Sequence, residues 1–414
     1  MKILASAIAC NPYLGSENYF GWSAITALAK DHDVWVVTSR RNEPDLARAA
    51  AEGIVPRTVH FVFAGEISEW SPNRLWARVQ SWKEYLNFAK DSLTVATDLH
   101  RREKFDLVQH VTYSTWRVAS PMWKLGIPFV YGPIAGNEPY PLRLFPILSV
   151  AGAAFELARN SSNFISRFFP EVRRSIQGAS HIFAITSESK ELMTSIRSSD
   201  KAITHLSAGF YSAEKAAQFS RFVEGKQVDG VLRLYVAGNL GGQKCIAIAF
   251  QALALVKKRG VNFRYHLGSG GPEIPHLKKL AAQLGIADEV IFGGSMARED
   301  YQQELGRTHV YLLPSMRETV GLTMLEAMLA GCVPIVAANG GPKITVQEDC
   351  GYQIAVTTPE QMADDIAKVI VEIDQNRQII AKKGRRASAR ICEAYTEEHY
   401  RETVNAVFEA IVKR

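Results

Sequence analysis

The chain has 414 residues, of which 47% are hydrophobic and 22% are charged. This length exceeds what one hydrophobic core usually supports, so two domains are expected. The formal net charge of +6 is too dilute over this length to indicate a nucleic-acid partner, and it suits a small anionic ligand or an anionic membrane surface. The cysteines form no C-x-x-C pair and are odd in number, which predicts neither a disulfide framework nor a zinc site and fits a reducing cytosol: Cys10, Cys245, Cys332, Cys350 and Cys392.

The N-terminal segment MKILASAIAC has two interpretations. Its lysine, apolar run and small residue before Cys10 resemble a short lipoprotein signal. The apolar run is brief, however, and continues into a pattern of glycine-bearing loop, amphipathic helix and strand, which favours the opening of a parallel α/β sheet. No other apolar run reaches the roughly 18 residues that a membrane span needs.

Apolar runs followed by helical periodicity recur along the chain, which predicts an α/β fold. In the first half the expected strands are Val34–Thr38, His60–Phe63, Leu107–His110, Phe129–Tyr131 and His181–Ile185. A polar stretch, Tyr211–Gly230, interrupts the pattern. In the second half the expected strands are Arg233–Ala237, Phe263–Leu267, Val290–Phe292, Val310–Leu313 and Val333–Val336. Two Rossmann-like domains with a cleft between them are the simplest architecture.

The turn after strand Val310–Leu313 is a candidate phosphate site. Glu318 lies in the loop, and the next helix is expected to start near Thr319 or Val320. The free amides around Gly321, Leu322 and Thr323 would then face a ligand, because a helix N-terminus carries unpaired donors and a partial positive charge. Glycine at this position lets a ligand approach the backbone closely.

Glu326 follows Glu318 by eight positions, about two helical turns further on. Its carboxylate could accept two hydrogen bonds from a vicinal diol such as a ribose, while Glu318 could meet the hydroxyl groups of a second sugar. The spacing alone leaves a plain alternative open. Glu318 would then complement the helix dipole, and Glu326 would be a solvated acid on a helix face.

Three stretches together give a family resemblance: LPSMRETVGLTMLEAMLAGCVPIVAANGGP, YHLGSGGPEIPHLKKLAAQLGIADEVIFGGS and GSENYFGW. With these the sequence resembles the retaining glycosyltransferases of family 4, which have the GT-B fold. The resemblance implies that Glu318 and Glu326 are the acid pair of the donor site, that the donor is an α-linked nucleotide sugar, and that no metal or other cofactor is required. The polar stretch between the two halves places the domains at 1–210 and 230–392, and the resemblance implies that a helix at 393–414 packs back on the first domain.

Lys244 lies in YVAGNLGGQKC, at the spacing from Gly238 where the family usually has a lysine, so the resemblance implies a contact with the donor diphosphate. Positive groups are needed there because charge develops on the leaving diphosphate. Directly after Gly238 the family usually has an arginine, and this chain has Asn239. Either another cation substitutes, with Arg317 and Lys343 nearest in sequence, or leaving-group stabilisation is weaker.

In the first half, the loop at Gly15 and Ser16 opens a helix, and the resemblance implies that it lies beside the donor phosphates. The alternative is a tight turn needed only for packing. His110 is expected at the end of a strand, hence at the cleft, and it matches a family histidine that contacts the transferred sugar. A hydrogen-bonded structural histidine is the equally weighted alternative.

The segment YGPIAGNEPYP resembles the G-P-x-G-G-G-E turn of a bacterial branch of these enzymes and indicates the acceptor side. Gly136, Asn137 and Glu138 are the acceptor-side candidates. Ala135 and Asn137 stand where that branch favours glycine, which suggests a shifted acceptor pocket.

Aromatic residues and arginines in PLRLFPILSVAGAAFELARNSSNFISRFFPEVRRS, and similarly in RLWARVQSWKEYLNFAKDSL, are a pattern that can lie on an anionic membrane surface. Burial in the core is the more frequent outcome for such stripes. A peripheral contact at the inner face of the membrane would bring a cytoplasmic enzyme to a lipid-linked acceptor.

The resemblance implies retaining, metal-independent transfer of a sugar from a UDP- or GDP-linked donor to a hydroxyl group of a glycan, lipid-linked oligosaccharide or other small acceptor. Three alternatives share the fold: a nucleotide-sugar epimerase, a phosphorylase-like enzyme with a pyridoxal phosphate lysine, and a non-catalytic nucleotide-sugar-binding relative. The sequence does not distinguish UDP from GDP and names neither the sugar nor the acceptor.

Overall fold

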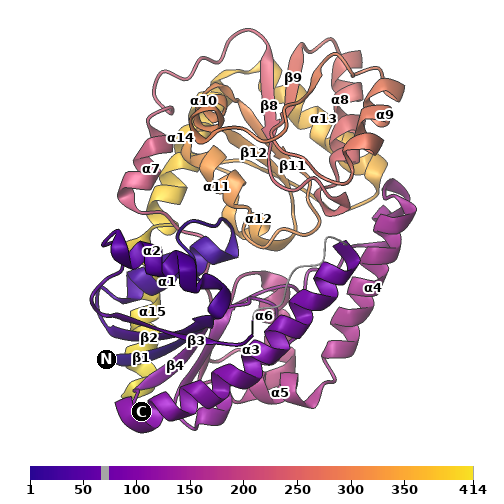
Figure 1. Ribbon diagram of the computed structural model, residues 1–414. Helices are drawn as coiled ribbons and strands as arrows, with labels where there is room; N and C mark the ends of the chain where they lie inside the picture. Colours follow the sequence, from indigo (N-terminus) through magenta and orange to yellow (C-terminus); the bar gives the residue numbers. More distant parts are fainter. Residues whose placement is uncertain (67–73, 414) are drawn as a thin grey trace. The chain divides into compact units, whose positions relative to one another are not determined.

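The computed structural model describes residues 1–66 and 74–413, and within helix α3 (Arg74–Glu103) it describes the side chains of all residues except 74–79, 81 and 82. The contacts divide the chain into two compact units, each coloured along the sequence in Figure 1. The first unit comprises Met1–Asn137, Ser162–Ala208 and Tyr400–Arg414. The second comprises Glu138–Ser161 and Gly209–His399.

The first unit is built on a parallel sheet with the strand order β3-β2-β1-β4-β5-β6-β7. Its strands are β1 (Lys2–Ala7), β2 (Asp33–Ser39), β3 (Val59–Ala64), β4 (Leu107–Thr112), β5 (Phe129–Ile134), β6 (His181–Ala184) and β7 (Ile203–His205). Every residue of β4 and β5 is buried, as expected for central parallel strands that are covered on both faces. The order is that of a Rossmann fold, in which the direction of strand addition reverses between β1 and β4.

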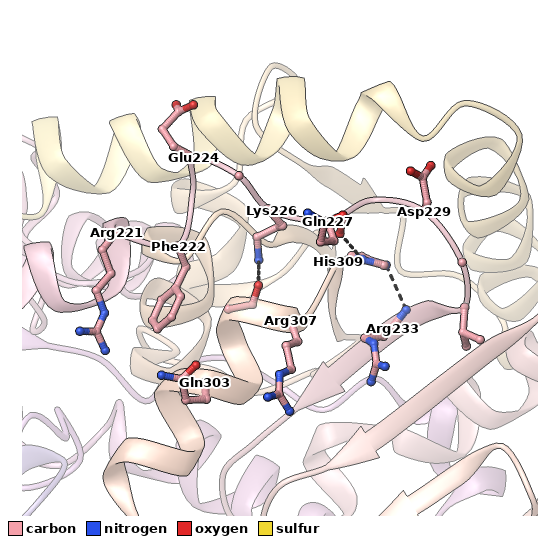
Figure 2. A pocket seen from close by; sticks show the side chains of 14 residues that line it. Arg221, Phe222, Glu224, Lys226, Gln227, Asp229, Arg233, Gln303, Arg307 and His309 are labelled. Atoms are coloured by element: carbon pink, nitrogen blue, oxygen red, sulfur yellow. Dashed lines mark hydrogen bonds between the residues drawn. The ribbon is translucent and has the colours of Figure 1, made fainter.

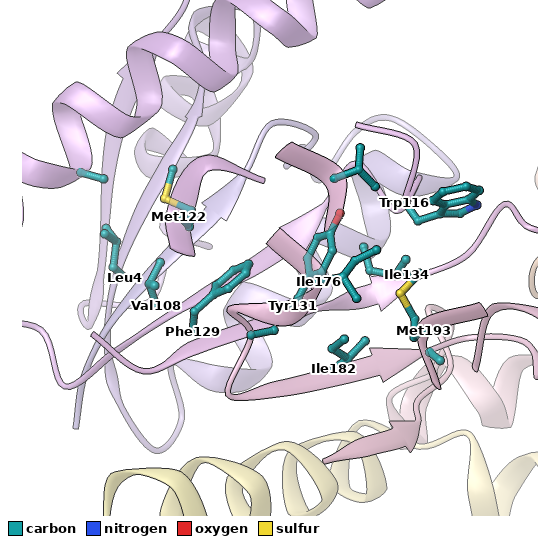
Figure 3. Close-up of a cluster of buried hydrophobic side chains, with 14 of the residues drawn as sticks. Leu4, Val108, Trp116, Met122, Phe129, Tyr131, Ile134, Ile176, Ile182 and Met193 are labelled. Carbon is teal, nitrogen blue, oxygen red and sulfur yellow. The ribbon is translucent and has the colours of Figure 1, made fainter. Parts of the chain in front are cut away.

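Helices flank this sheet and close a core of aliphatic and aromatic side chains. They are α1 (Glu17–Leu28), α2 (Glu43–Ala51), α3, α5 (Pro170–Gln177) and α6 (Ser187–Arg197), with the short helices η1 (Arg40–Asn42) and η2 (Pro121–Leu125). Figure 3 shows part of this core, which includes Phe129, Tyr131 and Ile182 on neighbouring strands, Ile176 of α5 and Met193 of α6. Burial of such side chains is the main favourable term in folding.

The second unit holds a parallel sheet with the order β10-β9-β8-β11-β12-β13. Its strands are β8 (Leu232–Val236), β9 (Phe263–Leu267), β10 (Val290–Phe292), β11 (Val310–Leu313), β12 (Val333–Ala337) and β13 (Tyr352–Ile354). The first five agree with the expected strands to within one residue. The order again reverses at the centre, here between β8 and β11.

Helical segments make up much of the rest of the second unit. They are η3 (Leu142–Ile147), the first part of α4 (Val150–Ser166), α7 (Ala213–Ser220), η4 (Gly242–Lys244), α8 (Ile246–Lys258), α9 (Ile274–Gln283), α10 (Arg298–Arg307), α11 (Leu322–Leu329), α12 (Gly340–Thr345), α13 (Pro359–Gln375) and α14 (Gln378–Ala394). The polar stretch 211–230 contains α7, whose Ser212 side chain caps its first turn.

The last helix, α15 (Glu397–Val412), belongs to the first unit from Tyr400 onward. The guanidinium of Arg401 lies 2.6 Å from the carboxylate of Asp31, and the ring of Tyr400 packs edge-on against that of Phe20 in α1. In Figure 1 this yellow helix lies beside β2 and α1. None of the helices in the described part of the chain is both long and apolar enough to span a bilayer.

Candidate active site

The candidate donor site lies at the point where the strand order of the second sheet reverses. Two loops leave the carboxyl ends of the adjacent strands β8 and β11, and in open α/β sheets this is where ligands bind. The first loop carries Gly238, Asn239 and Lys244, and the second carries Glu318 and Gly321. The chain topology therefore brings together two groups of residues that the sequence separates by more than 70 positions.

The two loops are joined by an ion pair. The ammonium of Lys244 lies 2.5 Å from Oε2 of Glu318, and both side chains are largely buried. Lys244 also lies against Gly238, because a Cβ atom there would be 3.6 Å from the Lys244 Nζ atom. A charge-assisted hydrogen bond in such a sheltered place is stronger than one between neutral groups. The sequence had indicated these residues separately and gave no sign of their contact.

Backbone contacts fix the loops on either side of this pair. The amide of Met316 donates to the carbonyl oxygen of Gln243 at 2.9 Å, and the Ser315 hydroxyl donates to the same oxygen at 3.0 Å. The position of Glu318 relative to Lys244 is therefore determined by the main chain as well as by the ion pair.

The double glycine after β12 allows a second close approach to Glu318. The amide of Gly341 donates to the Glu318 carbonyl oxygen at 2.9 Å. A Cβ atom at Gly341 would lie 2.0 Å from the carbonyl oxygen of Thr319, and one at Gly340, where φ is +59°, would lie 2.4 Å from that of Glu318. Only glycine fits at either position, so the role of these residues is to hold the loop that carries Glu318.

Helix α11 begins at Leu322, two to three residues later than expected, because Gly321 takes a left-handed conformation with φ +78° directly before it. The amides of Leu322 and Thr323 have no acceptor within the described chain, as is usual in the first turn of a helix. The Thr323 hydroxyl hydrogen-bonds the Tyr311 hydroxyl at 2.6 Å. The side chain of Thr323 is thus engaged, whereas its backbone can donate to an anion.

Glu326 lies on α11 and receives a hydrogen bond from the Tyr301 hydroxyl of α10 at 2.7 Å. Burial raises the pKa of Glu326, and the Tyr301 hydrogen bond opposes this shift. The plain alternative of a solvated helix-face acid is therefore wrong for Glu326, since its carboxylate is sheltered and partnered. Sequence reasoning missed Tyr301, because no motif links a tyrosine on α10 to an acid on α11.

Of the cations that could stand in for the arginine replaced by Asn239, Arg317 is already paired. Its Nη2 atom lies 2.7 Å from Oε1 of Glu156, a carboxylate that is 2% exposed. Asn239 is exposed, and so is Lys343 on α12. Arg317 is therefore held by an internal carboxylate, while Lys343 carries an accessible charge.

The segment 138–161 packs within the second unit. Glu138 is buried, and its carbonyl oxygen accepts a hydrogen bond from Nη1 of Arg159 at 2.7 Å. A Cβ atom at Gly340 would lie 3.7 Å from the Glu138 Cγ atom, so Glu138 lies beside the glycine turn that holds Glu318. The acceptor-side candidate Glu138 thus shares a unit with the donor-side residues.

The remaining acceptor-side candidates, Gly136 and Asn137, follow β5 and are the last two residues of the segment Met1–Asn137 of the first unit. Gly136 has φ +97°, which only glycine adopts readily. The Asn137 amide donates to the carbonyl oxygen of Glu188 at 2.8 Å. Both residues have clear structural roles, and an acceptor contact remains a prediction.

Gly15 and Ser16 precede α1, as expected. Ser16 occupies the N-cap position without a capping side-chain hydrogen bond. A Cβ atom at Gly15 would have no neighbour within 4 Å, and its φ does not require glycine. Packing alone therefore does not explain the glycine. The adjacent Glu17, which the sequence did not single out, accepts hydrogen bonds from the amides of Tyr113 and Ser114 at 3.1 and 2.6 Å.

His110 does not end its strand, because β4 continues to Thr112. The side chain is 2% exposed, and Nε2 lies 3.1 Å from the Tyr113 carbonyl oxygen, to which it donates. Burial lowers the pKa of His110 to about 4, so the ring is neutral at physiological pH. The prediction that His110 ends its strand is therefore wrong. Of its two predicted roles, only the hydrogen-bonded structural role has a partner among the described residues, the Tyr113 carbonyl oxygen.

Solved structures of GT-B proteins match nearly the whole chain. Sucrose-phosphate synthase from Thermosynechococcus elongatus has 16% identity and a TM-score of 0.64, over 99% of this chain and 98% of its own. HepE of Anabaena, solved with UDP, has 16% identity and a TM-score of 0.62, over 99% of this chain and 100% of its own. At such low identity these likenesses bear on the fold, and they confirm the predicted α/β GT-B architecture.

Residues 217–387 match the model of the family "Glycosyl transferases group 1", which agrees with the family 4 resemblance. A GDP-mannose-dependent alpha-(1-6)-phosphatidylinositol monomannoside mannosyltransferase of Mycobacterium tuberculosis is 30% identical over 133 residues, which are 30% of this chain and 34% of that protein. An alpha-D-kanosaminyltransferase of Streptomyces kanamyceticus is 28% identical over 144 residues, 34% of this chain and 37% of that protein. The matched segment spans only about a third of these relatives.

Proposed function

We propose that the chain is a retaining glycosyltransferase that moves a sugar from a nucleoside diphosphate sugar to a hydroxyl acceptor. The observation that carries the proposal is the Lys244–Glu318 pair at the strand-order reversal, next to the open first turn of α11. A cation and free amides suit a diphosphate, and a carboxylate suits sugar hydroxyl groups. The family match and the UDP bound by HepE support this assignment.

Lys244 and the amides of Leu322 and Thr323 would stabilise the charge that develops on the departing diphosphate. Glu326, with one oxygen already bound by Tyr301, would accept hydrogen bonds from the ribose diol. Glu318 would orient the transferred sugar. The Glu318 carboxylate can reach the sugar only if it leaves Lys244, whose ammonium would then bind a diphosphate oxygen instead. Donor binding would therefore rearrange this ion pair.

No carboxylate of the second unit has a clear place as a nucleophile, so a front-face route is proposed. The bond between the anomeric carbon and the diphosphate oxygen breaks, the acceptor oxygen bonds to the same face of that carbon, and the acceptor proton passes to the departing diphosphate. Positioning and electrostatics then supply the rate enhancement. The loop at Gly15 and Ser16 stays proposed for the donor phosphates, and His110 for the transferred sugar. Gly136, Asn137 and Glu138 stay proposed for the acceptor side.

A panel of UDP- and GDP-sugars in thermal-shift measurements tests donor binding, because a ligand stabilises the folded state by RT ln(1 + [L]/Kd). The donor that stabilises is then incubated with glycan acceptors, and NMR of the product should show an α-anomer. A sugar that is converted while still attached to its nucleotide would contradict transfer and favour an epimerase. Donor binding without hydrolysis or transfer would favour a non-catalytic relative.

We also propose that the first unit meets a lipid-linked acceptor at an anionic membrane surface. Four large apolar side chains within six consecutive positions are 49 to 63% exposed: Phe164, Ile165, Phe168 and Phe169. Arg167 lies over the Phe164 ring at 5.9 Å, and Arg173 and Arg174 follow on α5. Exposed apolar residues flanked by arginines suit an interfacial contact with anionic lipid. In the second expected stretch, residues 74–93, the side chains of 74–79, 81 and 82 lie outside the described residues.

Sedimentation with vesicles tests this contact. The full chain should bind vesicles that contain phosphatidylglycerol and should bind pure phosphatidylcholine weakly. Phe168→Ser with Phe169→Ser should reduce binding several-fold, whereas Ile54→Ser, which changes another exposed apolar residue of the first unit, should not. Equal binding by all three proteins would contradict the proposal.

A further inference from the structure

The second unit contains a pocket at the amino ends of the central strands β8 and β11, whereas the donor loops leave the carboxyl ends of the same strands. Its lining includes Gly230 and Arg233 at the start of β8, His309 directly before β11, and Arg307 at the end of α10. The pocket volume is about 600 Å³, within the range of small-molecule sites. Because β8 and β11 also carry the donor loops at their other ends, this pocket is separate from the proposed donor site.

Three arginine side chains define one rim of the pocket. Figure 2 shows the guanidinium groups of Arg221, Arg307 and Arg233 along the same side, with the amide of Gln303 between the first two. Within the described chain, the side chains of Arg233 and Arg307 have no hydrogen-bonded or ion-paired acceptor. Arg221 has only a 3.4 Å contact with the Gln302 amide and a stacking contact with Phe222.

The balance of charge at this rim is positive. Two carboxylates line the pocket, and one of them, Glu224, pairs with Arg385, which is not a lining residue. The Glu304 carboxylate is hydrogen-bonded to Nδ1 of His266 at 2.9 Å, which is the main cause that lowers its pKa, and the nearby charges of Arg233 and Arg307 lower it further. The guanidinium donors therefore remain available to a ligand.

The wall of the pocket is held in place by buried contacts. The Lys226 ammonium donates to the carbonyl oxygens of Leu305, Gly306 and Thr308 at 3.0, 3.2 and 2.7 Å, which closes the end of α10. His309 donates from Nε2 to the Gln227 carbonyl oxygen at 2.8 Å and accepts the Arg233 amide at Nδ1. These contacts fix the backbone from which the arginines project, so little ordering is needed when a ligand binds.

A second pocket of this unit shows the contrast. It is lined by Lys383 and Arg390, but both direct their donors to backbone carbonyl oxygens, Lys383 to Glu348 and Gly351 and Arg390 to Ile344 and Thr345. The cations of this second pocket therefore already donate to the protein backbone. Within the described residues, the side chains of Arg233 and Arg307 do not.

We propose that the rim of Arg221, Arg233 and Arg307 is a binding site for a small multivalent anion of the phosphate-ester or diphosphate class. Guanidinium groups bind phosphate oxygens in a bidentate manner, and two adjacent ones fit a ligand with more than one phosphate. The site is independent of the proposed transfer reaction, since it uses none of the donor-site residues.

Hydrogen exchange of the full chain with inorganic pyrophosphate is the test, against sodium chloride at equal ionic strength. Pyrophosphate should slow exchange in residues 221–233 and 298–309. The Lys244→Ala variant should keep this protection, because the substitution weakens pyrophosphate binding only at the donor loops. Protection confined to residues 236–245 and 315–325 would overturn the proposal.

Titration calorimetry then measures the affinity. Arg233→Ala with Arg307→Ala should weaken pyrophosphate binding at this site at least about tenfold, and the charge-retaining pair Arg233→Lys with Arg307→Lys should weaken it less. Arg264→Ala, which removes an exposed arginine of the same unit outside the pocket, is the matched control. An equal loss in this control would show diffuse charge attraction and overturn the site.

Discussion

Glu318 and Glu326 differ in their surroundings although both belong to one short stretch of chain. Glu318 is neutralised by Lys244, whereas Glu326 has a hydroxyl partner and a pKa raised by burial. A neutralised carboxylate must be released before it meets a ligand. A carboxylate whose partner is a hydroxyl group is not held in an ion pair, and its second oxygen can accept a hydrogen bond from a ligand. This difference assigns separate roles to the two acids.

Glu326→Ala should weaken binding of the cognate nucleotide by roughly 1.5 to 3 kcal/mol, the usual contribution of a hydrogen bond to a charged group. Calorimetry with UDP and GDP measures this loss. Because the pKa of Glu326 is raised, affinity should also fall as the pH is lowered toward and below that pKa, where the carboxylate becomes protonated. Glu299→Ala on α10, an exposed acid, is the control, and unchanged affinity in Glu326→Ala would remove this residue from the donor site.

Lys244→Ala should lower kcat together with kcat/KM, by roughly 10²- to 10³-fold, if the ammonium stabilises charge that grows as the glycosidic bond breaks. A loss of uniform binding would raise KM alone. Asn239→Arg should be tolerated or should raise activity, since Asn239 is exposed and Arg317 is held by Glu156. If the Lys244→Ala protein is folded and its turnover is near normal, another cation must contact the diphosphate, and Lys343 is the first candidate.

At the scale of elements, the glycine pair after β12 has a mechanical role that a change of one methyl group can test. Gly341→Ala places Cβ 2.0 Å from the Thr319 carbonyl oxygen, so the turn must move away and lose its hydrogen bond to Glu318. We expect a loss of stability of roughly 1 to 3 kcal/mol and a fall in turnover, with the larger effect on turnover. Denaturant unfolding and donor turnover measure the two effects.

Gly270→Ala is the matched control, because a Cβ atom there would have no neighbour within 4 Å and the backbone has an ordinary φ. It should leave both stability and turnover close to those of the parent. If Gly341→Ala behaves like Gly270→Ala, the glycine turn does not position Glu318.

The strands were predicted correctly from the sequence where the local pattern of apolar residues was strong. Ten expected strands are present, because parallel strands buried on both faces leave apolar runs in the sequence. The edge strands β7 and β13 were missed, since ITH and YQI are three residues long and only partly apolar. The start of α11 was misplaced because a left-handed glycine delays the helix after Thr319, a backbone feature that periodicity does not reveal.

The site was less predictable than the fold for a physical reason. Motif spacing singled out Glu318, Glu326 and Lys244, but the contacts that determine their chemistry come from distant elements. Tyr301 reaches Glu326 from α10, and Glu156 reaches Arg317 from α4. Such pairings depend on tertiary packing, and a single sequence contains no local signal for them.

At the scale of the whole molecule, three buried histidines make stability depend on pH. Burial lowers the pKa of His110 and His181 in the first unit, and of His309 in the second, from 6.5 to about 4. In the unfolded chain each would titrate near its ordinary value. Between these two values the unfolded state binds protons that the folded state does not, so lowering the pH favours unfolding.

We therefore expect the free energy of unfolding to be highest above pH 6.5, to fall progressively as the pH is lowered toward 4, and to have lost roughly 3 kcal/mol per histidine below that value, since one pKa unit corresponds to about 1.4 kcal/mol. Urea unfolding between pH 5 and 7.5 measures the slope before most carboxylates titrate, with the transitions of the two units followed separately. His309→Gln should flatten the slope in the second unit and leave the first unchanged. His399→Gln, an exposed histidine, is the control, and a slope that His309→Gln does not alter would show that this ring titrates alike in both states.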